Sequence, residues 1–118
     1  MKEVNNMFDC HLDPDVFEVV KKGIKNVEVR VYDEKRRRMK IGDEIVFLKR
    51  PLEQEKITTK IIGLKTYSNF NELVKDYNIE RLYLNTFTKE EFINLLGRFY
   101  SEEEQKEFGV VAIEFEVI

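Results

Sequence analysis

The stretch GIKNVEVRVYDEKRRR, residues 23–38, decides the fold class that the sequence predicts. Gly23 is typical of the end of a helix, and over residues 26–32 valines alternate with polar residues, as in a β-strand that buries one face. The charged run that follows is typical of an exposed hairpin loop. A helix, a strand and a loop thus follow one another closely, which indicates an α+β domain.

The flanking sequence changes between the period of a strand and the period of a helix. Apolar residues alternate again after Gly42 and at the C-terminus, which predicts further strands of one curved sheet. Thr88 with Glu91 and Ser101 with Glu104 have the spacing of capping boxes, which begin helices. We expect strands near residues 26–32, 44–50, 56–66 and 110–118, and helices near residues 14–22, 69–77, 89–98 and 102–107.

The composition indicates one globular domain over residues 1–118. Of these residues 42% are hydrophobic and 36% are charged, which excludes a disordered chain. The single cysteine, Cys10, cannot form an internal disulfide, and with the single histidine, His11, it gives too few ligands for zinc, so we expect no metal and no cofactor. The segment MKEVNNMFD lacks the apolar core of a secretory signal and no run is long enough to span a membrane, so we expect a cytoplasmic protein without a membrane partner.

The net charge of −3 is unevenly distributed. Residues 1–50 contain 12 Lys and Arg against 10 Asp and Glu, a balance of +2, whereas residues 51–118 contain 8 against 13, a balance of −5. This asymmetry permits a local positive surface for an anionic ligand but is too weak for a high-affinity binder of duplex nucleic acid.

Charged side chains in the quoted stretch allow two interpretations. Glu28 and Arg30 are two residues apart on one strand, so their side chains leave the same face about 7 Å apart at Cα, and Lys25 can join them from the strand's start. These residues are either a solvated strand face with a weak surface ion pair or the wall of a binding site. Similarly, the four consecutive cations Lys35, Arg36, Arg37 and Arg38 are either a solvated loop or a contact for phosphate.

The arrangement G-x-K-x-x-E-x-R over residues 23–30 resembles the signature of the small ASCH (activating signal cointegrator homology) proteins. The resemblance continues in IGDEIVF at residues 41–47, YSEEEQ at 100–105 and FGVVAI at 108–113, and so spans most of the chain. It implies a PUA-like fold, that is, a small mixed β-barrel with flanking helices.

The same resemblance implies that Lys25, Glu28 and Arg30 line a cleft, which Tyr100 and Ser101 border. It favours RNA or a nucleotide as the ligand, with phosphate contacts from basic residues and base stacking on an aromatic residue such as Tyr32 or Tyr100. For Ser101, a role as helix N-cap is sufficient by itself.

The alternative that the resemblance implies is hydrolysis of RNA or of a modified nucleoside. Some small ASCH relatives are amidohydrolases that deacetylate N4-acetylcytidine, and they have a threonine at the position of Glu28 beside a lysine that matches Lys25. Without that hydroxyl, Glu28 would act as a general base on water, with Lys25 or Arg30 stabilising an oxyanion. An acid from Glu102 or Glu103 would complete this scheme, which would also suit a ribonuclease. His11 is a further candidate acid, although a structural role is the simpler interpretation.

Overall fold

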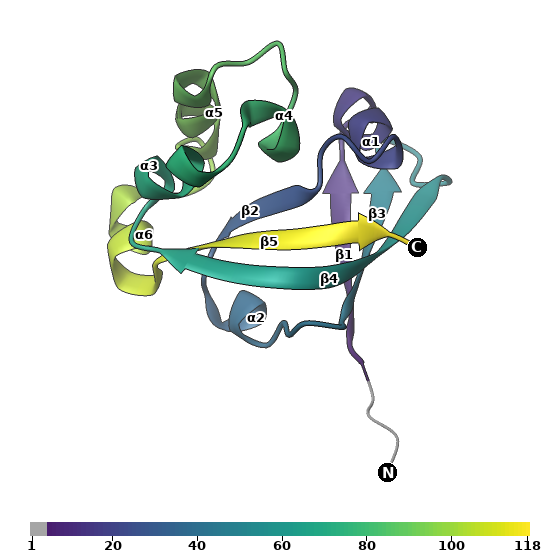
Figure 1. Ribbon diagram of the computed structural model, residues 1–118, viewed down its shortest axis with the longest axis horizontal. Coiled ribbons are helices and arrows are strands. Elements are labelled where there is room, and N and C mark those ends of the chain that lie inside the picture. The colour runs from purple at the N-terminus through teal and green to yellow at the C-terminus, as the bar shows by residue number, and fades with distance from the viewer. Residues whose placement is uncertain (1–4) are drawn as a thin grey trace.

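A curled, five-stranded mixed sheet forms the body of the computed structural model, which describes residues 5–118 (Figure 1). The first four residues of the N-terminal segment considered above lie outside the described residues. The sheet has the order β1-β3-β4-β5-β2; β1 is parallel to β3 and all other neighbours are antiparallel. The strands are β1 (Met7–Leu12), β2 (Val27–Val31), β3 (Glu44–Lys49), β4 (Lys56–Tyr67) and β5 (Val110–Val117).

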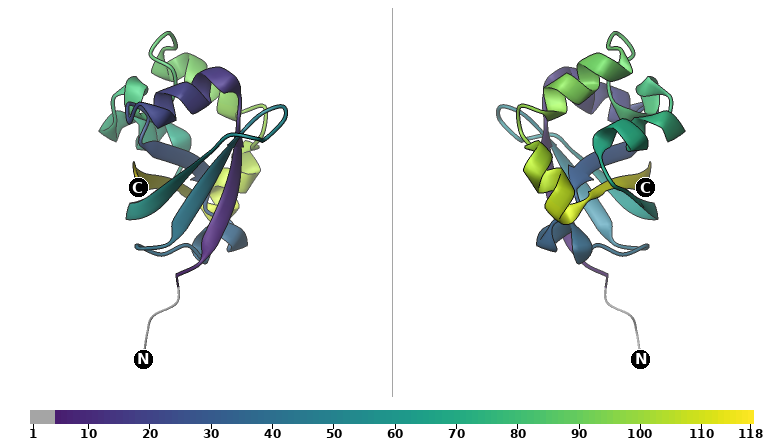
Figure 2. Two further views of the ribbon diagram at one scale, coloured as in Figure 1. Left: turned by 90° about the vertical axis from the view of Figure 1, so that its right-hand side faces the viewer. Right: turned by 90° about the vertical axis from the view of Figure 1, so that its left-hand side faces the viewer.

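Short helices cover the sheet at two places (Figure 2). One helix lies over the upper ends of β1 and β3, and a run of helices between β4 and β5 packs against β2 and β5. The helices are α1 (Pro14–Lys21), α2 (Glu34–Arg37), α3 (Phe70–Leu73), the 3-10 helix η1 (Val74–Asp76), α4 (Ile79–Leu82), α5 (Lys89–Leu96) and α6 (Glu102–Phe108). Within residues 5–118, none of them is both long and apolar enough to cross a membrane.

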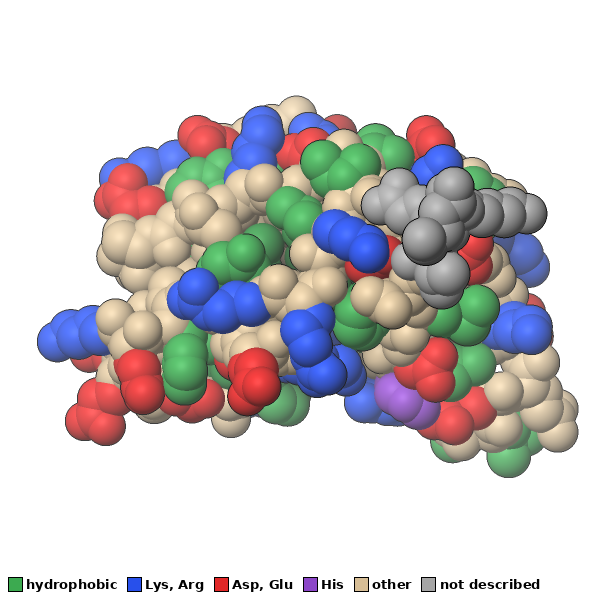
Figure 3. Space-filling view, turned by 90° about the horizontal axis from the view of Figure 1, so that it is seen from below, with side chains coloured by type: hydrophobic (Ala, Val, Ile, Leu, Met, Phe, Trp, Pro, Cys, Tyr) green, Lys and Arg blue, Asp and Glu red, His purple; other side chains and the backbone are tan. Residues whose placement is uncertain are grey.

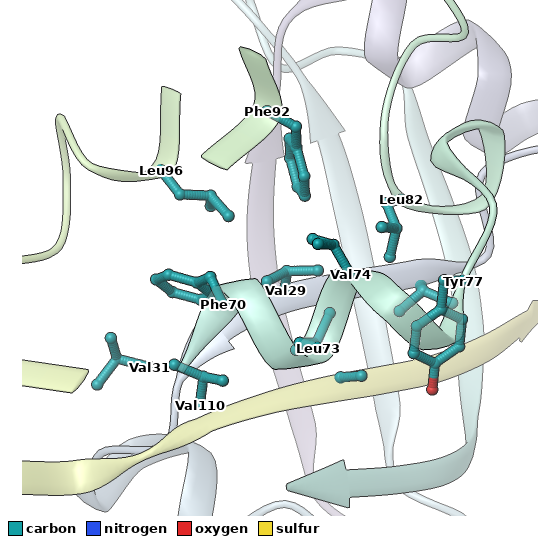
Figure 4. Close-up of a cluster of buried hydrophobic side chains, with 12 residues drawn as sticks. Val29, Val31, Phe70, Leu73, Val74, Tyr77, Leu82, Phe92, Leu96 and Val110 are labelled. Atoms are coloured by element: carbon teal, nitrogen blue, oxygen red, sulfur yellow. The ribbon is translucent and has the colours of Figure 1, made fainter. Parts of the chain in front are cut away.

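Two buried clusters of apolar side chains hold these layers together. The first lies between β2 and β5 and the helices α3 to α5, where Val29 of the sheet faces Phe70, Leu82 and Phe92 (Figure 4). The second lies under α1 and includes Phe47 and Phe115, whose ring centroids are 5.0 Å apart. Burial of these side chains favours folding by about 1.5–3 kcal/mol each before the cost of ordering the chain, so packing rather than helix propensity holds the short helices in place.

The expected strands and helices are confirmed to within a few residues, and both capping boxes are present. Three expectations were wrong. The charged run forms α2 rather than a hairpin loop, because the side chain of Asp33 accepts a hydrogen bond from Arg36 N at 3.1 Å and caps a helical turn. The helix expected over 69–77 changes from α3 to the 3-10 turn η1 after Leu73, and it ends at Asp76 because the backbone of Tyr77 is extended.

The third error concerns the strand over residues 26–32, which was expected to bury one face. Both faces of β2 are covered, and Glu28, on the face opposite the valines, is only 6% exposed. In addition β1, which the sequence did not predict, lies at one edge of the sheet, while β2 lies at the other edge. The curl of the sheet brings the two edges together, and within the described residues side chains rather than a backbone ladder connect them. We call this junction the seam.

Candidate ligand-binding cleft

A cleft of about 440 Å³ opens beside the seam. Its floor comes from β2 and the residues just before it, and its walls come from the end of β1, the start of α1, and α5 with the turn that follows. Apolar side chains make up most of the walls, and charged side chains make up the floor, which is the usual composition of a small-ligand site. The residues that line it are His11, Leu12, Asp13, Val16, Lys25, Glu28, Val29, Arg30, Arg50, Tyr83, Phe92, Leu95, Leu96, Phe99 and Tyr100.

Lys25 lies at the buried end of the floor. Its side chain is 3% exposed, and Nζ donates hydrogen bonds to the carbonyl oxygens of Val27 at 2.5 Å and Leu82 at 2.7 Å. The third direction of the ammonium faces Glu28 Oε1 at 3.7 Å. Lys25 thereby joins the start of β2 to the end of α4 through two hydrogen bonds and forms an ion pair with Glu28.

Glu28 lies at the centre of a group of donors. Its Oε1 accepts hydrogen bonds from Arg30 Nη1 at 2.8 Å and from Val29 N at 3.2 Å, and its Oε2 accepts from the Cys10 thiol at 3.5 Å. Arg30 Nη2 donates in turn to Cys10 Sγ at 3.0 Å, so that these contacts cross the seam. We refer to Lys25, Glu28 and Arg30 together as the charge cluster.

Within the charge cluster, each charge affects the pKa values of its neighbours. Burial by itself would raise the pKa of Glu28, but Arg30 and Lys25 outweigh it and hold this pKa below its usual value. Burial lowers the pKa of Lys25, although Glu28 opposes that shift. Burial, reinforced by the Glu28 carboxylate, raises the pKa of the Cys10 thiol to about 11, so the thiol stays protonated.

Arg30 is the member of the charge cluster that reaches the open part of the cleft. Its side chain is 22% exposed, against 3% for Lys25 and 8% for Glu28. Tyr100 borders the same space, and burial raises the pKa of its hydroxyl, which therefore remains a neutral donor. The structure thus places Lys25, Glu28, Arg30 and Tyr100 around one cleft.

Of the remaining candidates, only His11 lies at the cleft. Ser101 is outside the cleft: it is the N-cap of α6, and its hydroxyl accepts a hydrogen bond from Glu104 N at 3.1 Å. Glu102 and Glu103 are on the same helix and do not line the cleft either, so neither is placed as an acid beside Glu28. His11 does lie at the rim, where its Nδ1 contacts the carboxylate of Glu53.

The four cations of the charged run are on α2 and just after it, and Figure 3 shows the molecule from the side on which α2 lies in Figure 1. Two of them are engaged: Arg36 pairs with Asp33 at 2.9 Å, and Arg37 donates to the carbonyl of Phe108 at 2.9 Å while lying over the ring of Tyr32. Lys35 and Arg38 form no ion pair within residues 5–118. Lys and Arg side chains occupy the middle of this face, with acidic side chains mostly around them.

Sequence reasoning missed three residues of the site. Cys10 was assessed only as a disulfide or zinc residue, although it connects β1 to the charge cluster. Phe99, which was not considered as a site residue, is 70% exposed at the rim of the cleft, after the last residue of α5. Arg50 reaches the rim from the end of β3, where it pairs with Asp13 at 3.5 Å. Only Phe99 had a local signal in the sequence. It follows Gly97, and glycine is typical of the end of a helix.

This arrangement is suited to binding more than to acid–base chemistry. A general base needs an available lone pair and a pKa near the working pH, whereas Glu28 accepts three hydrogen bonds and has a lowered pKa. Lys25 is likewise occupied by two carbonyl oxygens. Over the part of the chain that the structure describes, no three His, Cys, Asp or Glu side chains are grouped as metal ligands.

Comparisons with known proteins identify the family. The ASCH domain profile matches residues 11–118. The chain belongs to the ASCH domain family. The crystal structure of the hypothetical protein PH0355 is 39% identical, with a TM-score of 0.81, over 95% of this chain and 99% of that one. The solution structure of protein PF0455 from Pyrococcus furiosus is 35% identical, with a TM-score of 0.76, over 95% and 97% of the two chains.

More distant relatives agree on the fold. A mutant of ZmASCH from Zymomonas mobilis is 15% identical, with a TM-score of 0.60, over 97% of this chain and 72% of that one. A comparison with curated proteins finds no match. The expectation of an α+β, PUA-like domain is confirmed. In this ASCH domain Lys25, Glu28 and Arg30 form the charge cluster on the floor of the cleft.

Proposed function

We propose that this ASCH domain binds RNA or a nucleotide and that the cleft holds one nucleotide unit. The observation that carries the proposal is the charge cluster itself: the buried Lys25 and Glu28 and the partly buried Arg30 meet at the floor of a cleft. Buried ion pairs add little stability over apolar residues of the same size, because desolvation of the charges offsets their attraction. A group of strongly perturbed charges in a cleft is therefore a better candidate for recognition than for stability.

The walls of the cleft suit a base. Phe99 and Tyr100 present aromatic rings at the rim, and Tyr83, which stacks on Phe92 with centroids 5.3 Å apart, presents a third. Stacking of a base on such a ring contributes about 1–3 kcal/mol and is tolerant of sequence. The volume of about 440 Å³ lies within the usual range for small-ligand sites.

One arginine on the floor of the cleft and one at its rim can bind a phosphate or the polar edge of a base. Arg30 presents its guanidinium from the floor and Arg50 presents another from the rim, where its side chain is 55% exposed. Lys35 and Arg38, which α2 and its C-terminus present on another face, add attraction for further phosphates that does not depend on sequence. We assign selectivity to the cleft and general electrostatic attraction to these two cations.

The proposal is tested by titrating the ¹⁵N-labelled protein with the four ribonucleoside monophosphates and with a short single-stranded RNA. We expect shifts of backbone amides around Lys25, Arg30 and Tyr100, and at least about tenfold weaker binding by Arg30→Gln, because a charged hydrogen bond contributes about 1.5–3 kcal/mol. Lys60→Gln, which removes an exposed cation outside the cleft, is the matched control. Unchanged affinity in a folded Arg30→Gln protein, or shifts confined to other faces, would contradict the proposal.

A further inference from the structure

A second and larger hollow, of about 850 Å³, lies beside the cleft. We call it the groove. It runs between α5, α6 and the start of α3, and no residue of the charge cluster belongs to it. Its polar side chains include Asn69, Asn71, Asn94, Arg98, Glu102, Gln105 and Lys106.

The groove and the cleft share one wall. Residues 97–101, which we call the ridge, contribute Gly97, Arg98 and Ser101 to the groove and Phe99 to the cleft, while Tyr100 lines both. The Tyr100 ring is held from behind by Phe70, with ring centroids 5.8 Å apart. The aromatic side chain between the two hollows is thus supported by the buried core.

The groove also offers polar groups that the fold does not use. Within residues 5–118, the side chains of Asn71, Asn94, Arg98 and Lys106 are exposed and form neither hydrogen bonds nor ion pairs. By contrast, the side chains of Asn69 and Gln105 accept hydrogen bonds from backbone N–H groups and are structural.

The charge of the groove suits a singly charged phosphate group. Arg98 and Lys106 contribute two positive charges and Glu102 contributes one negative charge, which leaves a balance of +1. Free amides can donate to and accept from a base edge or the 2′-hydroxyl, and the cations can bind the phosphate that joins two nucleotides.

We infer that the ligand is a single-stranded RNA segment of at least two consecutive nucleotides, one in the cleft and its neighbour in the groove, with the chain crossing the ridge at Tyr100. This inference rests on the proposed function of the cleft. A single strand is required because the two bases must part on either side of one aromatic ring, whereas a duplex keeps its bases stacked and paired. The inference extends the ligand from a mononucleotide to an oligonucleotide.

The test compares nucleoside monophosphates with 5′-phosphorylated dinucleotides and a single-stranded hexanucleotide by isothermal titration calorimetry. For the unmodified protein, we expect the best dinucleotide to bind at least about tenfold more tightly than either of its mononucleotides, because a second nucleotide adds stacking and phosphate contacts. The double variant Arg98→Gln with Lys106→Gln should lose most of this gain, yet bind mononucleotides within about twofold of the unmodified protein. Its slope of log K against log salt for the hexanucleotide should become shallower by about 0.7 for each phosphate that the variant no longer neutralises.

The matched control is Lys56→Gln with Lys60→Gln, which removes two exposed positive charges that line neither hollow. It should change the affinity for the dinucleotide by less than about twofold. Equal binding of mononucleotides and dinucleotides would overturn the inference but leave the proposed function intact. The inference would also be overturned if the groove variant and the control weakened dinucleotide binding equally. If mononucleotides, dinucleotides and the hexanucleotide all fail to bind, both the proposed function and the inference are wrong.

Discussion

Replacing Glu28 by glutamine should lower the free energy of unfolding by about 3 kcal/mol at pH 7. The substitution keeps the shape of the side chain but removes the negative charge between Arg30 Nη1 at 2.8 Å and Lys25 Nζ at 3.7 Å. The buried Lys25 and the partly buried Arg30 would then lack their counter-charge. Removal of one partner from a buried ion pair costs about 3–5 kcal/mol, and we place Glu28→Gln at the lower end for two reasons. Arg30 is 22% exposed and can be partly hydrated, and the amide oxygen can still accept the hydrogen bonds from Arg30 and Val29.

The effect should also depend on pH in a defined direction. The pKa of Glu28 is lower in the folded protein than in the unfolded chain, so its contribution to stability is complete above the unfolded pKa of about 4.3 and is lost as the pH falls through the folded pKa. The difference between the unmodified protein and Glu28→Gln should therefore stay constant from about pH 6 to pH 8 and shrink below about pH 4.

Urea denaturation followed by circular dichroism at several pH values measures both quantities. Glu116→Gln is the control, because Glu116 is an exposed carboxylate on β5, and its replacement should change the free energy of unfolding by less than about 0.5 kcal/mol. A loss below about 1 kcal/mol for Glu28→Gln at pH 7, or a loss that grows as the pH falls, would refute the view of Glu28 as the counter-charge of Lys25 and Arg30.

Three further outcomes follow from the site. Arg30→Ala should weaken RNA binding with little change in its salt dependence. The double variant Lys35→Glu with Arg38→Glu should weaken RNA binding and make its salt dependence shallower. Filter binding over a range of salt concentrations distinguishes the two variants. Iodoacetamide should alkylate Cys10 at pH 8 at least about a hundredfold more slowly in the folded protein than in urea, because a pKa of about 11 lowers the thiolate fraction by that factor. Equal rates of alkylation, measured by mass spectrometry, would contradict the raised pKa of the thiol. N4-acetylcytidine should stay intact with the unmodified protein in a chromatographic assay, since Glu28 is not arranged as a base, and its hydrolysis would make the protein an enzyme.

Local patterns in the sequence were sufficient to predict most of the fold. The period of two over residues 26–32 and the capping boxes at Thr88 and Ser101 are local signals, and the structure contains the corresponding elements. The strand β1 was missed because it is short and its residues are mostly exposed or half-buried, although Phe8, Cys10 and Leu12 alternate with Asp9 and His11. The helix α2 had a local signal in Asp33, which is its N-cap. It was missed because the charged run after Asp33 was interpreted as an exposed loop.

The candidate site could be predicted only in part, for a physical reason. The period of a strand places Glu28 and Arg30 on the same face, and the family resemblance pointed to a cleft. Whether that face is buried depends on segments far away in the chain, here Cys10 on β1 and Tyr100 after α5. No period in residues 23–38 carries information about these segments. The groove was missed for the same reason, because it exists only where α3, α5 and α6 meet.

The seam has a consequence for how such a domain can change during evolution. In most barrels the strands are joined by backbone hydrogen bonds, which tolerate exchange of side chains. Here Cys10, Glu28 and Arg30 connect the two edge strands through side chains, and two of these three belong to the charge cluster in the cleft. A substitution that altered ligand preference at Arg30 would at the same time loosen the closure of the barrel. New specificities are therefore easier to acquire at the rim, at Phe99, Arg50 or the exposed groove residues, where side chains can be exchanged while the two edges stay joined.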